Sequence, residues 1–318
     1  MTGRPSGSRP LLMSGDPIAS LRARGVQTDP IAPLGRLVRE DPDAVRELYE
    51  AQIEAGVDVL SALTVGTAPR ALAPIGMAFR SAALTGVAVD LAIEASASVS
   101  RRIAVAGVLG HFPGGLTSVE ADRIAEDYAT HATRLAAAGC EILVACGFAP
   151  AFSVPPGLAR LARRAAVVSA SATQLATWAL IELESSGRTA DGEGVEDAAR
   201  AALDAGADTL LFEVDSADLA LSVLARLERG RQEGQVGFLL GAPEREGGAD
   251  ELVDPAGREP EPAAQATLID AWVASALRLI DAGARVVGGG PGITVGHLSA
   301  LSKVLREARR APVWRRSF

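Results

Sequence analysis

Two glutamates stand late in two consecutive apolar segments of this 318-residue chain, Glu182 in one segment and Glu213 in the next. If the segments are neighbouring strands, the two carboxyl groups lie close together. Mutual repulsion then raises the pKa of one carboxyl group, which makes it a base that works near neutral pH, and the pair attracts a cationic substrate. Glu213 follows Phe212, and an unpaired carboxylate among apolar groups is costly. We therefore expect Glu213 to face a pocket or a partner.

Further reactive side chains follow other apolar segments. In a pocket beside the glutamates, His111 would serve as an acid, Cys146 as a wall or a nucleophile, and Asp215 as a substrate-binding group. An aromatic wall would help to bind a cation. The candidates for this wall are Phe112, Phe148 and Phe212.

Two other interpretations of these residues stay open. His111, Cys146, Glu182 and Glu213 carry imidazole, thiol and carboxyl groups, which are suitable ligands for a new metal site. Alternatively, these residues are polar groups at strand ends with no catalytic role. A lone cysteine is more often a buried small hydrophobe than a nucleophile.

One recurring phrase indicates how these residues are positioned. Four times a helical pattern ends in Ala-Gly and an apolar strand begins soon after, at Gly56, Gly139, Gly206 and Gly283. Glycine ends a helix at low cost because it accepts the left-handed conformation. The apolar strands are typical of a parallel sheet that is buried on both faces. The repeats therefore predict successive βα units.

Eight strands are expected to alternate with eight helices. The predicted strands are 10–13, 57–63, 103–109, 141–146, 177–183, 208–214, 236–241 and 285–289. The predicted helices are 41–55, 80–97, 117–138, 157–165, 195–205, 217–230, 265–282 and 294–309. This alternation favours an α/β fold of the (β/α)8 TIM-barrel type over an open doubly wound sheet. Active sites of such barrels lie at the C-terminal ends of the strands.

Composition excludes several classes of protein. A formal net charge of −8 argues against nucleic-acid and anionic-membrane partners. Two cysteines do not make a disulfide framework, and no apolar run predicts a signal peptide or a membrane span. We expect a cytoplasmic protein with a disordered tail over residues 1–9 and one barrel domain over 10–318. An acidic loop rich in Gly and Pro, at 243–264, would form a lid or a solvated insertion.

Several phrases resemble the homocysteine S-methyltransferase family. They are PDAVRELYEAQIEAGVDVL at 42–60, WALIELESSGRTADGEG at 178–194, DAGADTLLFEV at 204–214 and WVASALRLIDAGARVVGGGPGITVGHLSAL at 272–301. The resemblance runs over most of the chain and implies a barrel that transfers a methyl group to a thiol. In that family, a zinc ion held by three cysteines keeps the acceptor thiol ionised.

The three zinc cysteines of the family have no counterpart in this sequence. The resemblance places Val214 where the first cysteine stands, and Gly290 and Pro291 where the adjacent pair stands. None of these side chains ligates zinc. We therefore expect no zinc and no other cofactor.

The resemblance also suggests positions that bind substrate, namely Asp16, Thr64, Gly289 and Gly290. It implies a zinc-independent transferase that moves a methyl or related group from a sulfonium-type donor to a small thiol or amine. Two alternatives stay open: an inactive relative that binds a ligand or a partner protein, and a lyase or hydrolase that reuses the pocket. A homodimer is compatible with the family.

Overall fold

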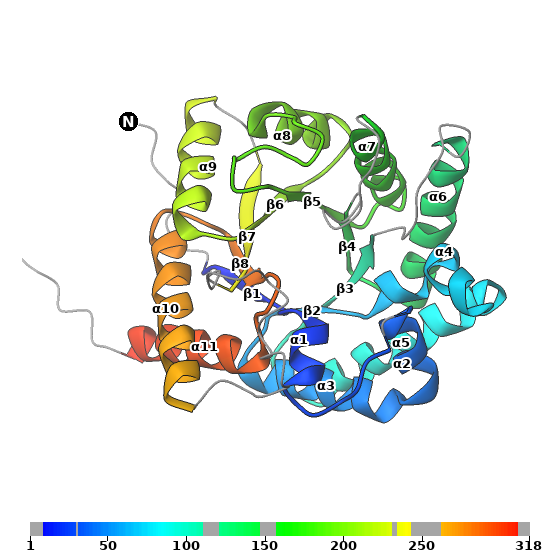
Figure 1. Ribbon diagram of the computed structural model, residues 1–318, viewed down its shortest axis with the longest axis horizontal. Coiled ribbons are helices and arrows are strands. Elements are labelled where there is room, and N and C mark those ends of the chain that lie inside the picture. The colour runs from blue at the N-terminus through cyan, green and yellow to red at the C-terminus, as the bar shows by residue number, and fades with distance from the viewer. Residues whose placement is uncertain are drawn as a thin grey trace, which may run out of the picture.

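The computed structural model describes residues 9–29, 31–110, 121–146, 157–230, 234–242 and 262–310. Within them, parallel strands β1 to β8 follow one another in sequence order, and β8 pairs back with β1 to close a barrel (Figure 1). The strands are Leu11–Met13, Val59–Ser61, Ala104–Leu109, Ile142–Ala145, Ala176–Glu182, Thr209–Val214, Gln235–Leu240 and Val286–Gly289. The predicted (β/α)8 barrel is therefore confirmed.

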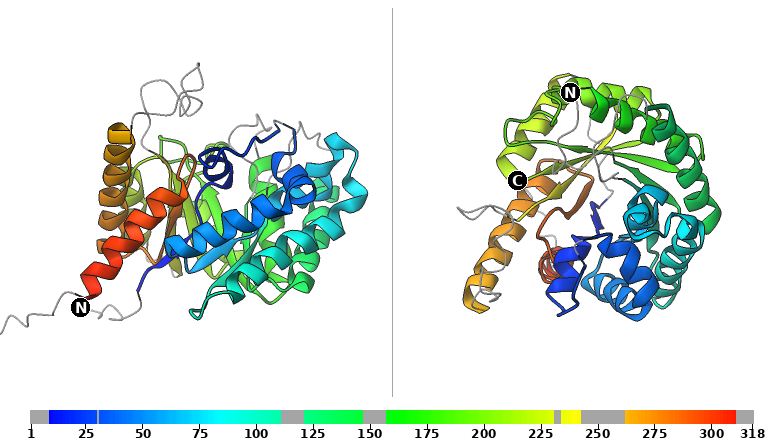
Figure 2. Two further views of the ribbon diagram at one scale, coloured as in Figure 1. Left: turned by 90° about the horizontal axis from the view of Figure 1, so that it is seen from below. Right: turned by 45° about the vertical axis from the view of Figure 1, so that its right-hand side comes forward.

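Helices form an outer ring around the strands (Figure 1). The α-helices, α1 to α11, are Pro17–Arg22, Pro33–Glu40, Pro42–Ala55, Pro69–Leu72, Ser81–Ala97, Ala121–Ala138, Leu158–Ser171, Val195–Asp204, Ala217–Arg229, Pro262–Asp281 and Val295–Arg310. Short 3-10 turns, η1 to η3, cover Thr64–Thr67, Ala73–Ile75 and Ala78–Arg80. Figure 2 shows α10 and α11 packed beside each other where the barrel closes. No described helix is both long and apolar enough to span a membrane.

The four Ala-Gly phrases behave as their sequence predicts. The φ angles of Gly56, Gly139, Gly206 and Gly283 are 104°, 101°, 102° and 107°, in the left-handed region that favours glycine. Each glycine follows the end of a helix and precedes a strand. The repeated phrase thus sets the turn from the outer ring back into the barrel.

Several boundaries differ from the prediction. Helix α7 continues past residue 165 to Ser171, because its apolar face stays buried through Val167 and Ala170. Helix α10 already begins at Pro262, where a proline suits the first turn, so the loop predicted at 243–264 ends earlier. The helices α1, α2 and α4 were not predicted. Residues 1–8 and 243–261 lie outside the described part of the chain.

The core has two layers, which show where each strand residue points. An inner cluster includes Trp178 and Leu180 of β5 and Leu211 of β6, whereas an outer cluster beneath the helices includes Phe212 and Val214. Successive residues of a strand point to opposite faces. Glu182 lies two residues beyond Leu180, and Glu213 lies two residues beyond Leu211. Both glutamates therefore point into the barrel, at its C-terminal end.

Candidate functional site

Glu182 and Glu213 form a pair at the mouth of the barrel. They are partners in the parallel register of β5 and β6, so their side chains leave neighbouring strands at the same level. Both are partly buried. The sequence prediction that these two carboxyl groups lie together is borne out by this register.

Burial dominates the electrostatics of the pair. Burial and then repulsion from Glu213 raise the pKa of Glu182 to about 9, against the opposing effect of the Arg163 guanidinium. Burial and then the charge of Asp16 raise the pKa of Glu213 to about 7. Near neutral pH, Glu182 is therefore a protonated acid, and Glu213 exchanges a proton readily. One buried group that can donate a hydrogen bond thus stands beside one that can act as a base.

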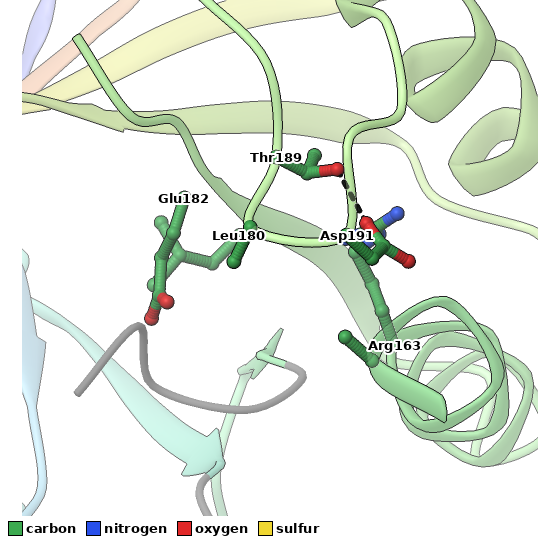
Figure 3. Close-up of a pocket in the computed structure, with 7 residues that line it drawn as sticks. Arg163, Leu180, Glu182, Thr189 and Asp191 are labelled. Atoms are coloured by element: carbon green, nitrogen blue, oxygen red, sulfur yellow. Dashed lines mark hydrogen bonds between the residues drawn. The ribbon is translucent and has the colours of Figure 1, made fainter. Parts of the chain in front are cut away.

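A buried ion pair lies near Glu182. Arg163 of α7 pairs with Glu193, and Arg160 approaches the same carboxylate at 3.2 Å. Arg163 also lines a small cavity with Glu182, Thr189 and Asp191. Its volume of about 20 Å³ is enough for one water molecule. Figure 3 shows the Thr189–Asp191 hydrogen bond, and the carboxylate of Glu182 points away from it.

Cys146 lies directly beyond β4 in the inner cluster and is 1% exposed. Burial, followed by the charges of Glu182 and Glu213, raises the pKa of its thiol well above the ordinary value. A protonated thiol is a weak nucleophile, so this environment suits a pocket wall. The phenol of Tyr128 on α6 is also buried, and the charges of Cys146 and Glu182 help to raise its pKa.

Asp16 and Thr64 are engaged by the backbone. One carboxylate oxygen of Asp16 accepts N–H groups at the start of α1, and the other accepts the Gly292 N–H at 3.0 Å. The Thr64 hydroxyl is buried, donates to the Val108 carbonyl and accepts the Val108 N–H at 2.7 Å. The Thr64 hydroxyl is therefore occupied by the backbone, whereas Asp16 also adds negative charge beside Glu213.

The two glycines at the end of β8 and directly after it, Gly289 and Gly290, leave no room for side chains. A Cβ on Gly290 would approach the Gly241 nitrogen at 2.9 Å and the Leu239 oxygen at 3.1 Å, and one on Gly289 would approach Ile293 at 2.6 Å. Their N–H groups already donate to the carbonyls of Ser14 and Leu240. These two amides are therefore not free to bind a phosphate.

The remaining candidates do not gather at this mouth within the described residues. Phe212 is fully buried against Phe238, with ring centroids 6.0 Å apart in the outer layer, so its expected role as a cation-binding wall is wrong. Asp215 lines a separate cavity between α9 and α10. His111, Phe112 and Phe148 lie outside the described residues.

The family model for homocysteine S-methyltransferase matches residues 18–305. The chain belongs to the homocysteine S-methyltransferase family. No curated protein matches the sequence.

Solved structures with the same fold include the homocysteine methyltransferase MmuM from Escherichia coli. The metallated form shares 19% identity over 93% of this chain and 96% of that chain, with a TM-score of 0.72. The oxidized form shares 20% identity over the same fractions, with a TM-score of 0.70. At this level of identity the likeness is one of fold. Family membership and this fold support a methyltransferase-like function that acts on small molecules.

The residues that the resemblance places at the family's zinc positions do not fit a zinc ion. Val214 packs in the outer layer, Gly290 is enclosed by backbone, and the exposed Pro291 has no ligand atom in its side chain. Among the described residues, no group of three His, Cys, Asp or Glu side chains is placed to hold a metal. The hypothesis of a new metal site therefore gains no support from Cys146, Glu182 and Glu213.

Sequence reasoning missed the surroundings of Glu182. Arg163 and Tyr128 lie on helical segments whose patterns indicate only an amphipathic helix. Thr189 and Asp191 lie within the phrase at 178–194 that resembles the family, which was the available signal. The positions of Tyr128 and Arg163 relative to β5 depend on how α6 and α7 pack against the barrel.

Proposed function

We propose that this protein transfers a methyl group from a small sulfonium donor to a small thiol without a metal ion, with Glu213 as the base. The observation that carries the proposal is the Glu182–Glu213 pair, which faces into the barrel of a chain whose sequence has no counterpart of the family's three zinc cysteines. An amine acceptor would suit the same pair.

Glu213 supplies what the thiol needs. A free thiol has a pKa of roughly 8.5, so little of it is ionised at neutral pH. A carboxylate with a pKa of about 7 takes that proton at small cost, whereas an ordinary glutamate is a much weaker base. Burial of Glu213 in the barrel therefore replaces part of the assistance that a metal would give.

The transfer balances in charge and atoms. Glu213 takes the thiol proton, and the acceptor sulfur forms a bond to the methyl carbon in line with the bond that breaks. The electron pair of the broken bond stays on the donor sulfur, which becomes a neutral thioether. The sulfonium charge and the Glu213 charge disappear together. Protonated Glu182 donates a hydrogen bond, and positioning of the two substrates supplies much of the rate.

A direct assay tests this role. Methyl transfer from a dimethylsulfonium compound to homocysteine is measured for wild type, Glu213→Gln and Glu184→Gln. Glu184 is an exposed glutamate two residues beyond Glu182 and is the matched control. We expect Glu213→Gln to lower kcat/KM by about 100-fold or more, with Glu184→Gln unchanged. Equal rates in wild type and Glu213→Gln, or no transfer by wild type, would overturn the proposal.

A further inference from the structure

A second cavity lies outside the barrel, where the ends of β6 and β7 meet α9 and α10. Its volume is about 380 Å³, which is the size of sites that enclose a small organic molecule. Asp215 and Ser216 line it from the β6–α9 turn, Gly241 from the end of β7, and Ser275 from α10. In Figure 1, α9 and α10 stand next to each other on this side of the barrel.

One carboxylate in this cavity is unpaired. Within the part of the chain that the structure describes, the half-buried Asp215 carboxylate has neither a hydrogen bond nor an ion pair. The other two charges of the lining neutralise each other, because Arg278 binds Asp218 at 2.7 Å on the exposed rim. The lining therefore carries one net negative charge, which favours a ligand with a single positive charge.

The other polar groups specify what kind of cation fits. Ser185 and Ser275 bring hydroxyl oxygens to the same cavity from two different elements. A primary ammonium has three N–H donors, which a carboxylate and two hydroxyls can accept. A quaternary ammonium or a sulfonium has no such donors and is bound by aromatic faces. The aromatic residue of this lining, Trp272, is fully buried and donates its indole N–H to the Leu240 carbonyl.

We propose that this cavity is a binding site for a small primary ammonium compound, with Asp215 as its counter-ion and Ser185 and Ser275 as hydrogen-bond acceptors. The site is separate from the Glu182–Glu213 pair. The proposal of an ammonium site does not depend on whether the protein transfers methyl groups.

Calorimetric titration with n-butylammonium chloride tests the site, with tetramethylammonium chloride as the comparison cation. We expect n-butylammonium to bind at least about tenfold more tightly than tetramethylammonium. Asp215→Asn should weaken n-butylammonium binding by about tenfold or more. Asp281→Asn is the matched control, because it removes an exposed carboxylate of α10 that does not line the cavity; its affinity for n-butylammonium should equal that of wild type.

A second variant changes the cavity wall without changing its charge. A Cβ on Gly241 would lie at ordinary contact distances, 3.5 Å from the Val214 oxygen and 3.7 Å from the Pro291 oxygen. Gly241→Ala should therefore fold, and the methyl group that it adds to the lining should weaken binding. Wild-type affinity in Asp215→Asn would overturn the proposal, as would equal affinity for both cations or no binding to wild type. Binding that is lost in Glu213→Gln and kept in Asp215→Asn would place the cation at the barrel mouth instead.

Discussion

Glu182 and Glu213 are register partners on β5 and β6, yet a different charge acts on each. The positive Arg163 of α7 lowers the pKa of Glu182, whereas the negative Asp16, in the turn before α1, raises the pKa of Glu213. Glu182 has the higher pKa of the two, because burial and repulsion outweigh the effect of the guanidinium. This difference divides the pair into an acid and a base.

The raised pKa values make the folded protein less stable as pH rises. An ordinary glutamate loses its proton near pH 4.5, whereas folded Glu213 and Glu182 hold theirs to about 7 and about 9. Between these limits the folded state binds more protons than the unfolded chain, so the free energy of unfolding falls with increasing pH. Urea unfolding at about pH 5 and about pH 9 should show a smaller fall in Glu182→Gln than in wild type, by a few kcal/mol.

The control for this prediction is again Glu184→Gln, whose side chain is exposed. It should follow the wild-type dependence on pH. If Glu182→Gln and wild type lose the same free energy between the two pH values, then the Glu182 carboxyl is not held protonated by the fold.

Arg163 is expected to stabilise the fold and to tune Glu182. Its guanidinium is 9% exposed and pairs with Glu193, which is 5% exposed. Arg163→Gln leaves Glu193 with the more exposed Arg160, so we expect a loss on the order of 3 kcal/mol in the free energy of unfolding. The pKa of Glu182 should also rise, because the charge that lowers it is gone.

Thermal unfolding and the infrared titration of the carboxyl groups measure both effects of Arg163→Gln. The neighbouring Arg164 is exposed, so Arg164→Gln should change neither. A stable Arg163→Gln protein with an unchanged Glu182 titration would show that the ion pair does not reach the mouth.

Restoring a cysteine after β8 should be harmful. A side chain at Gly290 meets the backbone of β7 and of Gly241 at 2.9 to 3.1 Å, and backbone cannot move aside cheaply. Gly290→Cys should therefore lower the free energy of unfolding by about 1–3 kcal/mol. Pro291→Cys lies on the exposed neighbour and should cost much less. Chemical denaturation of the two variants makes the comparison, and equal stability would mean that the turn has room for the family's cysteine.

The barrel itself was predictable from local signals. The Ala-Gly turns at Gly56, Gly139, Gly206 and Gly283 require a left-handed residue whatever surrounds them, and apolar strands follow each one. The direction of Glu213 was also predictable, since a carboxylate between apolar neighbours needs a polar environment. These inferences depend on short stretches of chain.

The rest of the site depends on contacts between distant segments. No local pattern indicates that Arg163 lies near Glu182, that Asp16 binds Gly292, or that Asp215 lines a cavity with α10. The prediction that Phe212 faces the substrate was wrong because one residue along a strand reverses the direction of the side chain. Phe212 and Glu213 therefore lie on opposite faces of β6.

The most direct test of the central claim is the metal dependence of methyl transfer. Wild-type protein is dialysed against a strong zinc chelator, and transfer from a dimethylsulfonium compound to homocysteine is measured before and after zinc is added back. Because the resemblance places Val214, Gly290 and Pro291 at the family's zinc positions, we predict the same rate in the chelated and zinc-supplemented samples. A rate that disappears with the chelator and returns with stoichiometric zinc would contradict a metal-independent reaction based on Glu213.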